Sequence, residues 1–217
     1  MRNYASNDIL SFFQKMNQQN IEYLLLMNIA NELPYNLPIR KDIDILIHPD
    51  CYKFYQEWMM KNDFKKIAHP HGLETGWIFL YGMNPNIKFE HMKNRMQIDA
   101  CDKLATKSIG MLAWVPLDQE IQTSIWRDKI WNPNLCCWQL DERNLFVYLV
   151  VRSVFEKNVF LSSYVTEIKK RKEYLNDPGV EKKLTHIFFC FTPILLNLLR
   201  QEEYDAIFNS YITFDDY

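Results

Sequence analysis

Two aspartates stand one residue apart in the segment RKDIDILIHPD, residues 40–50. Side chains alternate between the two faces of an extended strand, so Asp42 and Asp44 share one face and the isoleucines share the other. The two carboxylates then lie roughly 7 Å apart along the strand, and like charges that close are costly unless water or a cation screens them. A divalent cation such as Mg²⁺, which prefers carboxylate oxygens, would supply that screening. A solvated sheet edge is the alternative.

Composition narrows the function classes. The chain has 217 residues, 48% hydrophobic and 24% charged, which is typical of a soluble globular protein with one large domain or two small ones. The formal net charge of −2 provides no overall positive field for gathering nucleic acid, so we expect no nucleic-acid partner. Only 5 glycines are present, and no glycine-rich phosphate-binding pattern occurs.

Cysteine spacing and hydropathy indicate in which cellular compartment the protein lies. The 5 cysteines have no C-x-x-C spacing, so neither a zinc site nor a disulfide framework is indicated. The opening residues lack the continuous apolar core of a signal peptide. The most apolar late stretch, residues 187–199, is too short to span a bilayer and contains Pro193. We therefore expect a cytoplasmic protein with reduced thiols and no membrane span.

Hydrophobic periodicity places the aspartates among alternating helices and strands. Helices are predicted at 7–19 and 49–62, and strands at 21–27, 42–48, 63–68, 76–82 and 95–103. Beyond residue 141 the pattern is helical, with helices at 141–157, 161–174 and about 180–199, then a short tail helix. We therefore predict an α/β domain over 1–107, a connecting segment over 108–140 and a helical C-terminal domain over 141–217.

The order of these elements resembles the nucleotidyltransferase fold, in which neighbouring strands of a mixed sheet carry D-x-D and a third carboxylate. The segment YLLLMNIANELPYNLPIRKDIDILI (23–47) is similar to a bacterial nucleotidyltransferase family of uncharacterised function that often accompanies polysaccharide genes. Residues 140–168 also resemble the helical C-terminal part of that family. The resemblance implies an α+β fold: a nucleotidyltransferase-like mixed sheet flanked by helices and followed by a helical part.

In this family pattern, Asp42 and Asp44 match the paired carboxylates, and Asp99 in MQIDA matches the third. The resemblance implies a two-metal mechanism with Mg²⁺ or Mn²⁺, in which two ions clamp both ends of an in-line displacement at phosphorus. Asp42 and Asp44 would hold both ions. Asp99 would hold the ion nearer the acceptor hydroxyl and help to deprotonate that hydroxyl. The donor would be a nucleotide or nucleotide sugar, and the acceptor a saccharide or another small molecule.

One feature departs from the superfamily pattern. A glycine pair usually follows the first strand and cradles triphosphate, whereas this chain has Met27 and Asn28 there. Phosphate must then be held by side chains, with Asn28, Arg40 and Lys41 as candidates, or triphosphate activity is lost. In the helical part, Arg152 and Lys157 could contact a phosphate or form surface salt bridges.

Two alternatives to an active nucleotidyltransferase remain open at this point. The chain could be a catalytically inactive nucleotide- or sugar-binding module of the same fold, which the missing glycines favour. It could also be the nucleotidyltransferase component of a toxin–antitoxin pair, against which its fused helical part argues. For an active enzyme we expect a cleft between the α/β and helical parts, with the three aspartates on its floor.

Overall fold

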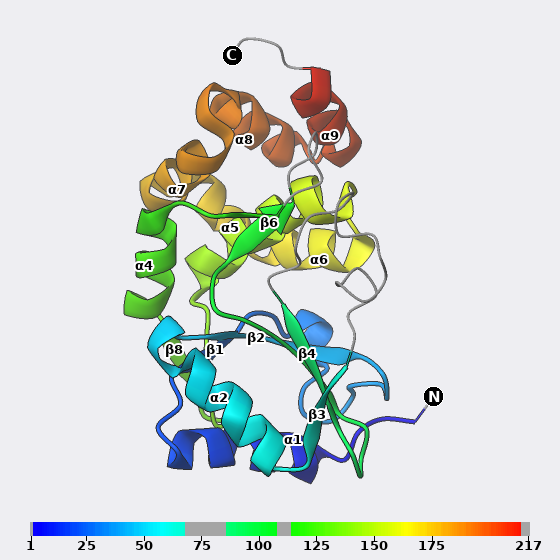
Figure 1. Ribbon diagram of the computed structural model, residues 1–217. Helices are drawn as coiled ribbons and strands as arrows, with labels where there is room; N and C mark the ends of the chain where they lie inside the picture. The colour runs from blue at the N-terminus through cyan, green and yellow to red at the C-terminus, as the bar shows by residue number, and fades with distance from the viewer. Residues whose placement is uncertain (1, 68–85, 108–113, 214–217) are drawn as a thin grey trace.

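The computed structural model describes residues 2–67, 86–107 and 114–213 (Figure 1). The predicted strand 76–82 therefore lies outside the described residues. The described strands are β1 (Tyr23–Leu25), β2 (Asp42–Ile47), β3 (Phe64–Ile67), β4 (Ile87–His91), β5 (Gln97–Cys101), β6 (Ala105–Lys107), β7 (Trp114–Pro116), β8 (Ile130–Asn132) and β9 (Cys137–Gln139).

Most helices lie in the second half of the described chain. The α-helices are α1 (Ser6–Gln18), α2 (Pro49–Lys61), α4 (Gln119–Arg127), α5 (Glu142–Val151), α6 (Ser162–Lys170), α7 (Pro178–Phe188), α8 (Thr192–Gln201) and α9 (Tyr204–Thr213). Short 3₁₀ turns are η1 (Ile29–Asn31), η4 (Lys172–Asn176) and η5 (Phe189–Phe191), and η3 (Arg152–Lys157) is a π-helix. No helix among the described residues is long and apolar enough to cross a membrane.

The described part of the chain forms a seven-stranded mixed sheet in the order β3-β4-β5-β2-β1-β9-β8, beside a small β6–β7 hairpin. β2 runs parallel to β5, and β1 runs parallel to β9, whereas the other neighbours are antiparallel. The predicted α+β class, a mixed sheet flanked by helices and followed by a helical part, is confirmed. In particular, the two aspartate-bearing strands are direct neighbours.

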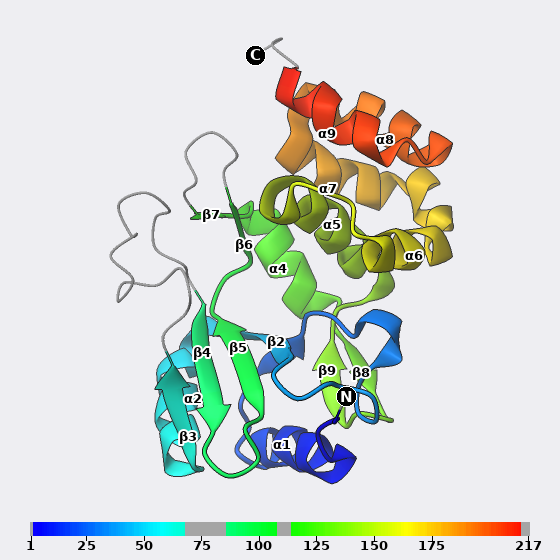
Figure 2. The same ribbon diagram turned by 90° about the vertical axis from the view of Figure 1, so that its right-hand side faces the viewer.

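Two hydrophobic clusters fix the sheet between its helices. Ile43, Ile45 and Ile98 are buried in one cluster with residues of α1 and α2. Leu46 and Cys101, whose side chains alternate to the other face, are buried in the second cluster with residues of the C-terminal helices. Figure 2 shows α1 and the helices α5 to α9 at opposite ends of the molecule. The face that carries the aspartates is therefore the one against which the helical part packs.

The segment predicted as a connection contributes to the sheet. β8 and β9 lie within 108–140, and Leu25 of β1 pairs with Gln139 of β9. The proposed boundaries at residues 107 and 140 stay a prediction, but the sheet itself extends across the first of them.

The helical part differs from its prediction at two breaks. The helix predicted over 161–174 ends at Lys170 and is followed by the 3₁₀ turn η4. The helix predicted over 180–199 ends at Phe188, because Phe189 has a positive φ of 49° and a short 3₁₀ turn follows. α8 then begins with Pro193 in its first turn, the helical position where the missing N–H costs nothing. The helix predicted over 141–157 is α5 continued by the π-helix η3, which ends at Asn158 in a left-handed conformation.

Candidate metal centre

The register of two parallel strands brings three carboxylates together. Asp44 in β2 lies directly beside Asp99 in β5, and Asp42 lies beside Gln97. One oxygen from each of Asp42, Asp44 and Asp99 lies within 4.8 Å of the other two. Three carboxylate oxygens at this spacing form a donor set that suits a hard divalent cation.

Asp99 is the most buried of the three carboxylates, with 8% of its surface exposed. Its Oδ1 is buried without a hydrogen-bond partner among the described residues. Burial, followed by the charges of Asp44 and Asp42, raises the pKa of Asp99 to about 7, against the lowering effects of Asn86 and Lys88. A cation would satisfy the orphaned oxygen and favour the ionised form, so the residues present fit a bound Mg²⁺ or Mn²⁺.

Asp44 is contacted from the helical part. Burial raises the pKa of the Asp44 carboxyl, Arg152 lowers it and Asp42 raises it further. Nη1 of Arg152 lies 3.3 Å from Oδ2 of Asp44, and Nε donates to Oε2 of Glu156 at 2.7 Å. The guanidinium also lies over the ring of Tyr148, at 5.7 Å from its centroid. The first residue of the π-helix is thus fixed at the edge of the carboxylate cluster.

Lys88 contacts the cluster from the opposite side. It lies beside Asp99 in the β4–β5 ladder, and its Nζ lies 3.0 Å from Oδ2 of Asp42. Sequence reasoning missed this residue. Strand alternation could have identified it, since Ile87 and Phe89 mark the apolar face of β4 and leave Lys88 on the aspartate face.

A pocket with a volume of about 290 Å³ opens beside the carboxylates, between the sheet and the helical part. It is lined by residues of the loop after β1, of β2, of η3 and of α6. The lining includes the predicted site residues Asn28, Lys41, Asp42, Asp44, Arg152 and Lys157, and Tyr164 of α6 beside them. Asp99 does not line this pocket, although its carboxylate meets those of Asp42 and Asp44.

The candidate phosphate contacts differ in their environments. Asn28 holds the loop, because its Oδ1 accepts a 2.9 Å hydrogen bond from the backbone N–H of Leu33. Lys41 lines the pocket and pairs with Glu32. Arg40 is exposed, as Lys41 is, but it has a positive φ of 79° and lies outside the lining residues. Of these three, Lys41 is the cation placed to meet a ligand in the pocket.

The two helical-part candidates both lie at the pocket. Lys157 pairs with Glu156 at 2.8 Å, and Arg152 pairs with the same glutamate and with Asp44. Each therefore forms salt bridges, but those of Arg152 are largely buried and not the surface pairs of the sequence-based alternative. Their place in the lining also leaves them within reach of a bound phosphate.

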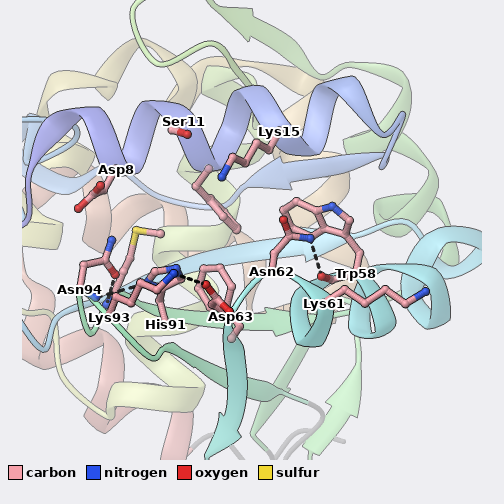
Figure 3. Close-up of a pocket in the computed structure, with 13 residues that line it drawn as sticks. Asp8, Ser11, Lys15, Trp58, Lys61, Asn62, Asp63, His91, Lys93 and Asn94 are labelled. Carbon is pink, nitrogen blue, oxygen red and sulfur yellow. Dashed lines mark hydrogen bonds and ion pairs between the residues drawn. The ribbon is translucent and has the colours of Figure 1, made fainter.

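Another pocket, of about 370 Å³, lies between α1 and the β3–β4 hairpin (Figure 3). Figure 3 shows Lys93 and Asp63 joined in it, and this ion pair measures 2.7 Å. None of the three clustered aspartates lines it. The larger cavity is thus remote from the carboxylate chemistry, and the smaller pocket is the functional candidate.

Comparison with known proteins gives structural similarities alone. No family model and no curated protein sequence matches the chain. The antibiotic-resistance factor ANT(2'')-Ia matches with a TM-score of 0.48 and 9% identity, over 92% of this chain and 99% of that one. The lincosamide antibiotic adenylyltransferase LnuA matches with a TM-score of 0.47 and 10% identity, over 80% of this chain and 99% of that one. An antigenic nucleotidyltransferase-like protein from Paracoccidioides brasiliensis matches with a TM-score of 0.44 and 12% identity, over 90% of this chain and 91% of that one. Similarity at this level assigns neither a family nor an activity to this chain.

Proposed function

We propose that this protein is a metal-dependent nucleotidyltransferase, or a transferase of a related phosphoryl ester, acting on a small-molecule or saccharide acceptor. The observation that carries the proposal is the convergence of three carboxylates on neighbouring strands, one with a buried oxygen that lacks a partner among the described residues. A structural ion-pair network has no need of such an oxygen, because an unsatisfied buried acceptor costs free energy.

Asp42, Asp44 and Asp99 would hold Mg²⁺ or Mn²⁺, which neutralises the charge that develops on a transferred phosphoryl group. We assign Asp99 to the acceptor side. With Oδ1 bound to the ion, its carboxylate would help to deprotonate an acceptor hydroxyl that meets the same ion. Arg152 and Tyr164 of the helical part wall the pocket on one side, where they would limit the access of water.

The donor would be a nucleotide or nucleotide sugar whose phosphates meet side chains in place of the absent glycine loop. Lys41, Arg152 and Lys157 all line the pocket beside Asp42 and Asp44. Charge-assisted contacts to phosphate are strong, and a guanidinium can make two at once. Asn28 would act by holding the loop that carries the pocket wall.

A specific observation supports a second candidate, an inactive nucleotide- or sugar-binding module. Lys88 and Arg152 already pair with Asp42 and Asp44, so two of the three carboxylates have cationic partners without a metal. The toxin–antitoxin alternative, the association with polysaccharide synthesis and the cytoplasmic location rest on the sequence alone and stay predictions.

A thermal-shift titration of nucleotides and nucleotide sugars, with and without Mn²⁺, tests the proposal. We expect stabilisation that requires the metal and is lost in Asp42→Asn but kept in Glu57→Gln, which changes an exposed carboxylate of α2. Donor binding that is indifferent to Mn²⁺ and to Asp42→Asn would favour the inactive module. No binding of metal or of any donor in the panel would overturn the proposed function.

A further inference from the structure

Lys88, Asp99 and Asp44 form a row across three neighbouring strands. Lys88 of β4 pairs with Asp99 of β5, which in turn pairs with Asp44 of β2. Residues that pair directly across strands point to the same face of a sheet, so all three share the aspartate face. From this row the Lys88 side chain reaches Asp42, whose Oδ2 lies 3.0 Å from Nζ. Only 16% of the Lys88 side chain is exposed, so its charge is weakly screened.

Arg152, on the other side of the cluster, is already balanced. It contacts Oδ2 of Asp44, but Glu156 takes its Nε at 2.7 Å and is itself mostly buried. Lys157 also pairs with Glu156, but a third of its side chain is exposed, at 33%. Lys88 differs from both, since among the described residues its ion pair is with Asp42, a candidate metal ligand, and no second carboxylate pairs with it.

The charges of the cluster limit how many divalent ions it can take. When ionised, the three carboxylates carry three negative charges, of which Lys88 cancels one. The Arg152–Glu156 pair adds no net charge, and Lys157 at the pocket wall can only reduce the remainder. At most two negative charges remain, which a single divalent ion neutralises. A second ion would meet net repulsion until donor phosphates arrive.

We propose that Lys88 is a built-in cation that takes the place of one of the two divalent ions expected from the sequence. Without a donor, the protein then binds one Mg²⁺ or Mn²⁺, at the carboxylate oxygens that neither Lys88 nor Arg152 occupies. This inference rests on the proposed function, because it takes the three aspartates as metal ligands.

Calorimetric titration with Mn²⁺ in the absence of nucleotide tests the inference. Wild-type protein should bind one ion. Lys88→Met removes the charge but keeps an unbranched chain of similar length, and should bind a second ion or bind the first about tenfold more tightly. Lys66→Met is the matched control, since Lys66 of neighbouring β3 is exposed and donates to Gln56 at 2.8 Å. It makes the same change in net charge and should titrate like the wild type.

The possible results test the role of Lys88 and the proposed function separately. Two ions bound by the wild type without nucleotide would overturn the role of Lys88 and leave the proposed function standing. Equal stoichiometry and affinity for the wild type and Lys88→Met would do the same. No Mn²⁺ bound by the wild type, alone or with donor nucleotides, would overturn the proposed function itself. Circular dichroism checks the fold of each variant, and Lys88→Gln, whose amide can still donate to Asp42, provides the comparison if Lys88→Met does not fold.

Discussion

Asp44 and Ile45 are adjacent in β2 and point to opposite faces of the same sheet, into two different environments. Ile45 is fully buried among apolar side chains of α1, α2 and the neighbouring strands. Asp44 meets Asp42, Asp99 and the guanidinium of Arg152. One strand therefore carries a packed core on one side and, on the other, a concentrated set of charges beside the buried Leu46.

The difference separates residues whose burial stabilises the fold from residues whose burial costs free energy. Burial of Ile45 contributes on the order of 2 kcal/mol through removal of apolar surface from water. Asp44 and Asp99 gain no such term, since burial and mutual repulsion raise the pKa values of both carboxyls. A protein under selection for stability alone would not keep this face, which is the pattern that functional sites show.

The largest expected effect is on catalysis. Asp44→Asn keeps the shape of the side chain but removes its charge, so transfer activity should fall on the order of 10³-fold while the fold is kept. Steady-state kinetics with a donor found by the thermal-shift panel measures this loss of activity, with Glu57→Gln as the control. Activity within tenfold of the wild type would remove Asp44 from the site.

The neighbouring residue should give the opposite result. Ile45→Ala leaves a cavity in a fully buried cluster, which should lower the free energy of unfolding by about 2–5 kcal/mol. Urea denaturation measures the loss, and activity per folded molecule should stay near that of the wild type. A variant of Ile45 that is stable but inactive would erase the contrast between the two faces.

The aspartate face should also show itself in the pH dependence of stability. Because the pKa of Asp99 is raised to about 7, the folded metal-free protein binds a proton that the unfolded chain has released. Its free energy of unfolding should then fall as the pH rises from about 4 to about 7, by on the order of 3 kcal/mol. Denaturation with chelator present, at several pH values, measures this slope. Asp99→Asn should flatten it, and an equal slope in that variant would assign the effect elsewhere.

The smallest expected effect is on donor binding, at two neighbouring cations beside the aspartate face. Lys41 lines the pocket, whereas Arg40 beside it does not. Lys41→Ala should weaken donor binding by about fivefold, a modest loss because this lysine is partly exposed and paired with Glu32. Arg40→Ala should change donor affinity by less than about twofold. Isothermal titration with the same donor compares them, and a larger effect at Arg40 would move the phosphate site out of the pocket.

Local patterns were enough to predict the carboxylate strands. The alternation of aspartate and isoleucine in 42–47 assigns each side chain to a face, and the same alternation in 95–103 assigns Asp99. Both predictions depend on a period of two, which the chain displays within a few residues. The structure places Asp44 and Asp99 side by side in register.

Features made by distant parts of the chain were not predictable in this way. The parallel pairing of β1 with β9 joins segments more than 100 residues apart, and nothing local in either strand indicates it. Lys88 was missed because no strand was predicted over 87–91; alternation within β4 assigns it to a face, but only the pairing of β4 with β5 brings it to the carboxylates. The break at Phe189 was missed because the apolar periodicity runs through it, although Pro193 stands four residues later.

The register between β2 and β5 has a genetic consequence. Side chains of a strand alternate between its two faces. Deleting one codon between the start of β5 and Asp99 would therefore turn that carboxylate towards the apolar cluster that contains residues of α1 and α2. Most single replacements in the same strand would leave it in place. During evolution, β5 should therefore tolerate amino-acid substitutions far more readily than single-residue insertions or deletions.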